Sequence, residues 1–400
     1  MKNINLIFLW FINIFLGVLR FRKRKNKLWI FGAWGGDSYS DNSKYLFEYV
    51  SNNLPSINAV WITGDKKIKN RLIQSNKKCL MCDEPNGLRA RLDAGFVFFT
   101  NGINDFGKFD LCHGAIKIAL WHGMPLKKMQ YATPNSKKRK TNIFRYLQYI
   151  TSKIYNQSKR NISIATSEST KNDLIECFEV KPEDVFITGQ PRNDGFFKKT
   201  SNTLIKNKLK HTPENSFILY MPTWRNFNNQ DSYLEDVINE LKEDSFFQNE
   251  MMKNKVTLYV KPHPRISINI SSNDNIIILD GNSNFDPQEL LCAADVLITD
   301  YSSVFIDFAL LNRPIHFFVP DLKEYEINNN GLLHPFSSIC DFWFSGFNEL
   351  KFAIINTPEY TKSGNNNSFK INEKYNDPGL DVGNYCSILI EQLNNKFQII

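Results

Sequence analysis

Short apolar runs alternate with longer amphipathic stretches along most of this 400-residue chain. The runs are apolar throughout, which is typical of parallel strands covered on both faces. In the first half of the chain they predict strands at 28–33, 58–63, 77–81, 95–100, 116–121, 162–167 and 185–189. Residues 40–53, by contrast, place apolar side chains at helical spacing. Helical stretches between several of the strands indicate βαβ winding.

The same alternation restarts after a polar, basic stretch at 198–215, which we interpret as an inter-domain linker with a short helix inside it. Strands are predicted at 217–222, 256–262, 275–280, 295–300 and 314–320, and helices at 231–249, at 286–294, from 302 and in the tail from 384. The chain is long enough for two domains with buried cores. We therefore predict an α/β fold with two Rossmann-like, doubly wound domains, 28–200 and 201–400, facing a cleft.

Residues 1–27 form a separate apolar and basic segment. Residues 4–19 are almost wholly apolar and 20–27 are basic, which is the reverse of the charge order in a secretory signal. Sixteen helical residues reach about 24 Å, short of the roughly 30 Å hydrocarbon core. We expect a membrane-associating helix at the cytoplasmic face of the cell membrane, with the basic run held by anionic lipid and the protein peripheral. A spanning helix and a buried first helix of the fold remain open.

The charge balance favours anionic partners. Lys and Arg number 49 and Asp and Glu 41, a formal charge of +8, which suits nucleotides, phosphate polymers or an anionic membrane surface. The seven cysteines are scattered and odd in number, which indicates reduced thiols. Cys79 and Cys82 lack the second pair that a zinc site requires, so we interpret them as buried, inert thiols.

Unusual polar residues follow five predicted strands, and ligands of open α/β sheets lie beyond the carboxyl ends of the strands. These residues are His122 and Lys127 in WHGMPLKK, Arg192, Asn193 and Asp194 in GQPRND, Thr223, Trp224 and Arg225 in MPTWR, Lys261, His263 and Arg265 in KPHPR, and Thr299, Asp300, Ser302 and Ser303 in ITDYSS. The co-occurrence at one topological edge predicts a common site.

Two features of these motifs suit a diphosphate substrate. Ser302 or Ser303 is predicted to be the N-cap of a helix, whose free N–H groups and dipole attract anions. His122 and His263 lie in stiff Gly- or Pro-containing turns, where an imidazole can accept a proton or stabilise phosphate oxygens. Phosphoryl transfer depends mainly on such positioning and charge neutralisation. The sequence has no P-loop, no G-x-S-x-G and no D-x-D at a strand end, so we expect neither a metal nor a cofactor.

In this order, WHGMPLKK, GQPRND, MPTWR, KPHPR and ITDYSSVFIDFALLNRPIHFFVPDLKEYE resemble the CDP-glycerol glycerophosphotransferase family, which builds teichoic acids and related capsules. The resemblance implies a GT-B-type fold. It also matches His122 and His263 to two essential histidines, and Ser302, Ser303 and Arg313 to positions near the donor's diphosphate and nucleotide. Met124, Gln190 and Pro262 depart from the usual family residues, which leaves the identity of donor and acceptor open.

The resulting hypothesis is a transferase that moves a polyol-phosphate unit, glycerol phosphate or a related one, from a CDP-polyol to a lipid-linked or polymeric acceptor and releases CMP. His122 is assigned as general base, with His263 as the alternative. Lys261, His263, Arg265, Thr299, Asp300, Ser302, Ser303 and Arg313 are assigned to the donor, and Lys127, Arg192, Asn193, Asp194, Thr223, Trp224 and Arg225 to the cleft and acceptor. A GT-B glycosyltransferase that uses a nucleotide sugar, and a non-enzymatic phosphopolymer-binding protein, are the alternatives; no nucleic acid is expected.

Overall fold

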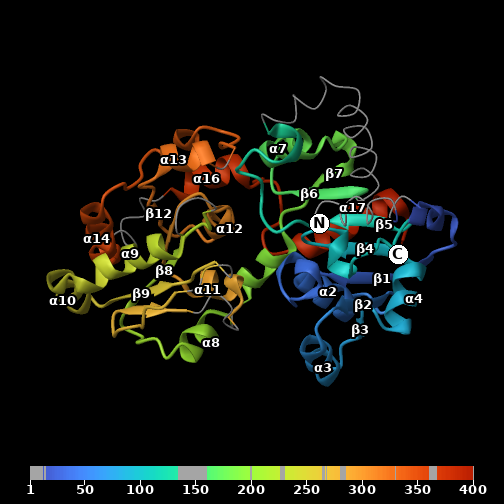
Figure 1. Ribbon diagram of the computed structural model, residues 1–400, viewed down its shortest axis with the longest axis horizontal. Coiled ribbons are helices and arrows are strands. Elements are labelled where there is room, and N and C mark those ends of the chain that lie inside the picture. The colour runs from blue at the N-terminus through green and yellow to red at the C-terminus, as the bar shows by residue number, and fades with distance from the viewer. Residues whose placement is uncertain are drawn as a thin grey trace. The chain divides into compact units, whose positions relative to one another are not determined.

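The computed structural model describes residues 12, 15–133, 160–198, 201–225, 230–263, 266, 268–279, 285–328, 330–359 and 367–399. The chain forms two compact units, shown in Figure 1. Unit 1 comprises 1–124, 134–194 and 379–400, and unit 2 comprises 125–133 and 195–378. The predicted division near residue 200 is thus corrected in two places: 125–133 folds with unit 2, and the C-terminal tail folds with unit 1.

Unit 1 is built on a parallel sheet with the order β3-β2-β1-β4-β5-β6-β7 in the described residues. The strands are β1 (Lys25–Gly32), β2 (Asn58–Thr63), β3 (Cys79–Met81), β4 (Ala94–Phe99), β5 (Ile116–Ala119), β6 (Ile162–Ala165) and β7 (Val185–Ile187). The helices are α2 (Asp41–Asn53), α3 (Lys66–Gln74), α4 (Pro85–Asp93), α7 (Glu168–Phe178) and α17 (Tyr385–Phe397), with short 3-10 turns η1 (Leu16–Phe21), η2 (Trp34–Gly36), η3 (Ile103–Phe106) and η5 (Pro182–Asp184). The direction of winding changes between β1 and β4, which is the switch point where doubly wound sheets bind ligands.

Continuous apolar strands bury both faces of this sheet. Trp29, Phe31 and Phe98 pack on one face with apolar residues of α2, α3 and α17, and the Phe31 and Phe98 rings stack with centroids 4.7 Å apart. Residues of α4 and η3 cover the other face. Leu389 and Leu393 of α17 are fully buried, so the C-terminal helix completes the core of unit 1.

Unit 2 contains a second parallel sheet, of order β10-β9-β8-β11-β12 in the residues described. Its strands are β8 (Ser216–Met221), β9 (Val256–Val260), β10 (Ile276–Ile278), β11 (Val296–Thr299) and β12 (Ile315–Phe317). Its helices are α8 (Ser201–Lys208), α9 (Gln230–Glu243), α10 (Ser245–Lys253), α11 (Pro287–Ala293), α12 (Val304–Ala309), α13 (Leu322–Asn328), α14 (Phe347–Ile355) and α16 (Ser368–Tyr375), with turns η4 (Gln130–Ala132) and η7 (Phe336–Ser338); η6 (Pro191–Phe197) runs from unit 1 into unit 2. Apolar residues of α9, α10 and α14 pack against the sheet.

The helix predicted at 231–249 is two helices. Asp244 interrupts it because its carboxylate accepts a hydrogen bond from Phe247 N (2.9 Å) and caps α10. Lys351 Nζ of α14 also forms ion pairs with the Asp244 and Glu240 carboxylates, each at 2.8 Å. The apolar spacing alone did not reveal this break.

The basic run at 20–27 belongs largely to the fold. β1 begins at Lys25, and Arg22 and Lys25 pair with Asp93 at 2.6 and 3.0 Å. Arg24 donates to the carbonyls of Arg91 (3.0 Å), Leu92 (2.5 Å) and His113. Anionic lipid was expected to bind the whole run. This is wrong for Arg24, because its guanidinium donates to backbone carbonyls instead.

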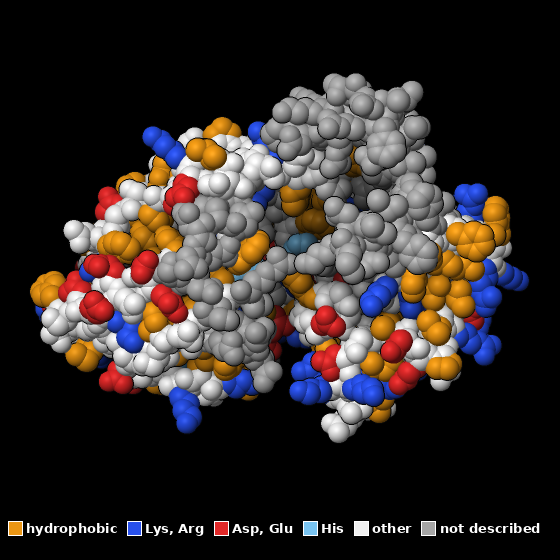
Figure 2. All heavy atoms as spheres, viewed as in Figure 1, with side chains coloured by type: hydrophobic (Ala, Val, Ile, Leu, Met, Phe, Trp, Pro, Cys, Tyr) orange, Lys and Arg blue, Asp and Glu red, His pale blue; other side chains and the backbone are white. Residues whose placement is uncertain are grey.

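Most of the apolar stretch 4–19 that predicts a membrane-associating helix, namely 4–11, 13 and 14, lies outside the described residues. Within the part of the chain that the structure describes, no helix has the length and apolarity needed to cross a bilayer. The 3-10 turn η1 carries a few exposed apolar side chains beside basic ones. Figure 2 shows this mixture at the margin where Figure 1 places the dark-blue N-terminal segment.

Candidate active site

The WHGMPLKK motif leaves the carboxyl end of β5, next to β4 at the switch point of unit 1. Leu120 N still bonds to Phe99 O (2.8 Å), so strand pairing runs up to the motif. Trp121 then adopts a left-handed φ of 60°, and Gly123 a φ of 152°. Bulky residues with positive φ are uncommon and cluster at functional sites. This turn presents the His122 side chain at the end of the sheet.

The His122 imidazole is held on three sides. Nδ1 lies 3.2 Å from Thr100 O, the first residue after β4. The ring is half-buried between the indoles of Trp34 and Trp121, with centroid distances of 5.1 and 4.6 Å. A carbonyl only accepts, so this contact is a hydrogen bond when Nδ1 carries the hydrogen. In the neutral ring that tautomer leaves a lone pair on Nε2, as a general base requires.

Arg192, predicted to lie at the acceptor, holds the backbone of this motif. Its Nη1 donates to His122 O (3.0 Å) and to Asp41 Oδ1 (2.8 Å), and its side chain is buried. Asn42 accepts from Arg192 N (3.1 Å) and donates to Trp121 O (3.0 Å). These contacts join α2, the β5 turn and η6, residues that lie up to 151 positions apart. Arg192 therefore acts on the shape of the His122 turn.

Asp194 and Asn193 also make internal contacts. The Asp194 carboxylate accepts from Tyr385 N (2.7 Å) and Cys386 N (3.0 Å), the first two residues of α17. A carboxylate at a helix N-terminus satisfies N–H groups that would otherwise have no partner. Asn193 is 1% exposed, and its N–H bonds to Gln190 O (2.9 Å). Asp194 thus caps α17 from outside the helix, and its assignment to the acceptor stays a prediction.

In unit 2, Arg225 and Asp300 neutralise each other in the protein interior. Arg225 Nη1 lies 3.0 Å from Asp300 Oδ2, and its Nε and Nη2 contact Asp321 at 2.5 and 3.0 Å. Asp300 is fully buried and also accepts from Thr223 N (2.8 Å). A buried arginine with two carboxylates has little charge left for a ligand. Arg225 and Asp300 together join the ends of β8 and β11. The assignments of Arg225 to the cleft and of Asp300 to the donor stay predictions.

Lys127 packs against this charged cluster. Its backbone forms an antiparallel bridge to Leu332, and its Nζ lies 4.9 Å from the centroid of the Tyr325 ring. Tyr325 in turn stacks on Tyr301 at 3.6 Å, and Tyr301 Oη donates to Asp321 Oδ1 (3.0 Å). Burial lowers the pKa of Lys127 to about 8, although the nearby Asp300 charge opposes the shift. Lys127 thus belongs to unit 2 although it follows His122 by five positions.

Ser302 and Ser303 are placed differently from Thr299 and Arg313. Ser303 is the N-cap of α12, as predicted, but its hydroxyl does not make the expected capping bond. Neither serine hydroxyl has a hydrogen-bond partner among the described residues, and both side chains are half-buried. Thr299 Oγ1, by contrast, donates to Met221 O (2.8 Å). Arg313 Nη1 donates to the carbonyls at the end of α11, Cys292 (2.8 Å) and Ala294 (2.6 Å).

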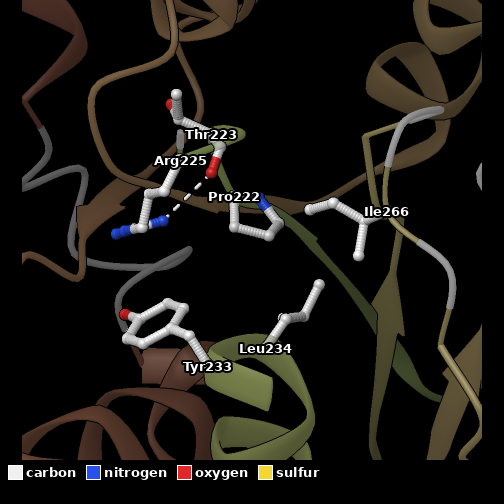
Figure 3. Close-up of a pocket in the computed structure, with 6 residues that line it drawn as sticks. All are labelled: Pro222, Thr223, Arg225, Tyr233, Leu234 and Ile266. Carbon is white, nitrogen blue, oxygen red and sulfur yellow. Dashed lines mark hydrogen bonds between the residues drawn. The ribbon is translucent and has the colours of Figure 1, made fainter. Parts of the chain in front are cut away.

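The residues after β9 lie near those after β8. His263 is half-buried, and its ring lies 6.3 Å from that of Trp224. Lys261 is 5% exposed at the strand end, and Arg265 lies outside the described residues. A small pocket opens beside them, lined by residues after β8, from α9 and after β9 (Figure 3): Pro222, Thr223, Arg225, Tyr233, Leu234 and Ile266. Its cavity volume is about 10 Å³, far below the roughly 300–1,000 Å³ of a typical ligand site, so the pocket by itself does not hold a nucleotide.

Four residues that contact or support the His122 turn were not predicted from the sequence: Trp34, Asp41, Asn42 and Asp105. The signal for Trp34 is the AWGGDS stretch that follows the first buried strand, because paired glycines after a strand indicate a specialised turn. Asp41 is the first residue of α2, which acidic residues commonly occupy. Asp105 has no comparable local signal, because its partners come from two other turns.

Comparison with known proteins identifies relatives of this chain. Residues 14–367 match the family model described as CDP-Glycerol:Poly(glycerophosphate) glycerophosphotransferase. The chain is 30% identical over 322 residues to a teichoic acid poly(glycerol phosphate) polymerase of Bacillus spizizenii, covering 78% of this chain and 79% of that protein. It is 34% identical over 232 residues to a teichoic acid glycerol-phosphate primase of Bacillus subtilis, covering 56% of this chain and just over half, 54%, of that protein.

Solved structures show the same fold. The wall teichoic acid polymerase TagF superposes with a TM-score of 0.73 over 94% of this chain and 90% of that one, at 21% identity. A putative UDP-N-acetylglucosamine 2-epimerase from Listeria monocytogenes superposes less closely, with a TM-score of 0.55 at 10% identity over 93% of this chain and 97% of that one. At these identities the likeness concerns only the fold of the two α/β units. It agrees with the predicted GT-B-type architecture.

Proposed function

Since this chain belongs to the CDP-glycerol:poly(glycerophosphate) glycerophosphotransferase family, we propose that it extends or starts a teichoic acid chain with glycerol phosphate from CDP-glycerol. The acceptor hydroxyl oxygen forms a bond to the β-phosphorus of CDP-glycerol. The bond between that phosphorus and the bridging oxygen of the diphosphate breaks, and CMP leaves with the electron pair. The proton of the hydroxyl is taken up by a base of the protein.

The observation that carries this proposal is the orientation of His122. Thr100 O accepts from Nδ1, which leaves Nε2 as a proton acceptor at the switch point of unit 1. An imidazole positioned in this way can remove the proton of an attacking hydroxyl, a contribution of about 10²–10⁴-fold to the rate. The flanking indoles of Trp34 and Trp121 restrict rotation of the ring.

We assign the donor diphosphate to the strand ends of unit 2. The hydroxyls of Ser302 and Ser303 have no partner among the described residues and can donate to phosphate oxygens. His263, and Arg265 by its sequence position, would supply positive charge, as oxyanion stabilisation requires. Lys261 and Arg313 support this edge from buried or capping positions. Thr223 and Trp224 border the pocket and His263 respectively.

We further propose that the acceptor is lipid-linked and that the protein acts peripherally at the cytoplasmic face of the membrane. Exposed apolar side chains on the N-terminal turn support this, since Phe15 and Phe21 are 80% and 77% exposed next to Arg20. Aromatic side chains beside basic ones favour the membrane interface. The amphipathic turn would bring the enzyme to its acceptor.

CMP release tests the function directly. Purified protein is incubated with CDP-glycerol and a glycerol-phosphate-primed acceptor, and CMP and the extended product are measured by mass spectrometry. We expect acceptor-dependent CMP release that falls by about 10²–10⁴-fold in His122→Ala with little change in the KM for CDP-glycerol, whereas His263→Ala should also raise that KM. The reverse pattern would exchange the two roles. Release of a nucleoside diphosphate from a nucleotide sugar, or near-normal CMP release from both variants, would refute the proposal.

A further inference from the structure

Asp105 is a fully buried carboxylate with an unusual set of partners. It lies on η3, directly after the switch-point strand β4. Its Oδ1 accepts from Gly35 N at 2.7 Å, and its Oδ2 accepts from Thr100 N and Asn101 N, both at 3.0 Å. Both oxygens therefore accept from backbone N–H groups, the pattern of an ionised carboxylate. Burial raises the pKa of Asp105, and these N–H groups oppose that shift.

Asp105 holds two of the backbone segments that contact the His122 ring, those of Trp34 and Thr100. Thr100 receives the Asp105 bond on its N–H and presents its carbonyl to His122 Nδ1. Gly35 follows Trp34, whose ring packs on the imidazole and whose backbone φ is 51°. Trp34 N also lies 3.4 Å from Thr100 Oγ1, so the two segments contact each other.

We infer that Asp105 is a positioning residue for the base: its carboxylate fixes the Thr100 carbonyl and the Trp34 indole, and thereby keeps His122 in the Nδ1–H tautomer and in one orientation. The inference rests on the proposed function, in which His122 Nε2 takes the proton. Metal ligands and catalytic bases are commonly oriented by a second residue that contacts no substrate, and Asp105 acts here through backbone groups. It makes no contact with substrate in this role.

The isosteric variant Asp105→Asn separates this role from burial. An amide has one acceptor oxygen and an NH2 group, so it cannot accept from the Gly35 and the Thr100–Asn101 segments together. The NH2 group of the new side chain would then face the N–H groups of one of the two segments, and that segment would be displaced. We expect kcat to fall by about 10- to 100-fold, less than in His122→Ala, with the KM for CDP-glycerol within about twofold of wild type.

Asp110→Asn is the matched control. Asp110 is also a buried carboxylate of unit 1, but it lies before β5 and pairs with Lys117 Nζ at 2.6 Å and Cys112 N at 2.9 Å. We expect it to lower the Tm while leaving the kcat of the folded protein unchanged. Thr100→Ala is the gentler second variant, because it removes only the hydroxyl between Asp105 and Trp34; we expect a fall in kcat of a few-fold.

The imidazole itself provides a readout that overall stability does not affect. In protein labelled with ¹⁵N-histidine, the His122 signals, assigned through His122→Ala, should show a protonated Nδ1 in wild type and in Asp110→Asn. Asp105→Asn should show a mixture of tautomers. A wild-type pattern with unchanged kcat in both Asp105→Asn and Thr100→Ala, or an equal loss of kcat in Asp110→Asn, would overturn the inference while leaving the function intact. Failure of the wild type to release CMP would instead overturn the function, and the tautomer measurement would still test the role of Asp105.

Discussion

At the scale of single residues, the environment decides what each histidine can do. His122 is half-buried with one nitrogen on a carbonyl, whereas His316 on β12 is 8% exposed and packs against Phe344 with ring centroids 5.6 Å apart. Burial lowers the pKa of His316 to about 4. The same side chain is therefore placed for proton transfer in unit 1 and is kept neutral inside unit 2.

This difference predicts an acid-sensitive stability. Between about pH 6.5 and pH 4 the unfolded chain binds a proton at His316 that the folded chain does not, so the free energy of unfolding falls as the pH is lowered through this window. At pH 5 the loss from this residue amounts to about 2 kcal/mol. Denaturant titrations at pH 7 and pH 5 should show a smaller decrease in His316→Gln than in wild type. An equal decrease in both would assign the acid sensitivity to other groups.

At the scale of elements, the N-terminal basic run fastens the first strand. Arg24 reaches carbonyls that precede β4 and β5, and Gly114, at a φ of 87°, lets the chain pass close to Arg20, where a Cβ would come within 2.7 Å of its carbonyl oxygen. An added side chain at Gly114 would clash there. The segment is thus a structural part of unit 1, even where its exposed side chains remain able to meet a membrane.

We expect Arg24→Met to lower the free energy of unfolding by about 1–3 kcal/mol, because several carbonyls lose a charged donor. Lys23→Ala is the control: the Lys23 side chain is exposed and contacts no charged or hydrogen-bonding partner among the described residues, so the variant should change stability by less than about 0.5 kcal/mol. Thermal and urea unfolding measure both. Equal stability of the two variants would show that the run does not fasten β1.

At the scale of the whole molecule, unit 1 combines N-terminal segments of the chain with the C-terminal residues 379–400. α17 inserts Leu389 and Leu393 into the core beside α2, and Asp194 caps its first turn. Gly189, at a φ of 71°, lies against the Tyr385 ring, where a Cβ would approach to 2.3 Å. A chain cut near residue 200 would therefore lack part of the core of its first domain.

We expect Asp194→Ala to cost about 1–2 kcal/mol of stability, as the loss of a helix cap does. Deletion of 379–400 should go further and leave unit 1 unable to fold, because the apolar face that α17 covers becomes exposed. Asp184→Ala is the matched control, because Asp184 of η5 also contacts α17: its ion pair with Lys396 (2.7 Å) is partly exposed and should contribute less than about 1 kcal/mol. Calorimetry distinguishes these outcomes, and a stable, folded chain ending at 378 would contradict the assignment of α17 to unit 1.

The sequence by itself determined the class of the fold and the family. Apolar runs and amphipathic stretches are local patterns, so the strands and most helices follow from neighbouring residues, and the motifs after them identify the glycerophosphotransferase family. It also placed the polar residues at strand ends, because parallel strands share one carboxyl edge.

Only the tertiary structure decided which of those residues remain available for chemistry. The side chains of Arg192, Asp194, Arg225 and Asp300 bind one another, other carboxylates or backbone groups, and the long-range partners described above lie 70 to 192 positions away in the chain. Asp105 and Trp34 meet His122 for the same reason: three turns that are distant in sequence converge at the switch point. Local spacing cannot encode such partners, because hydrogen bonds between turns form only after the sheet has fixed the order of its strands.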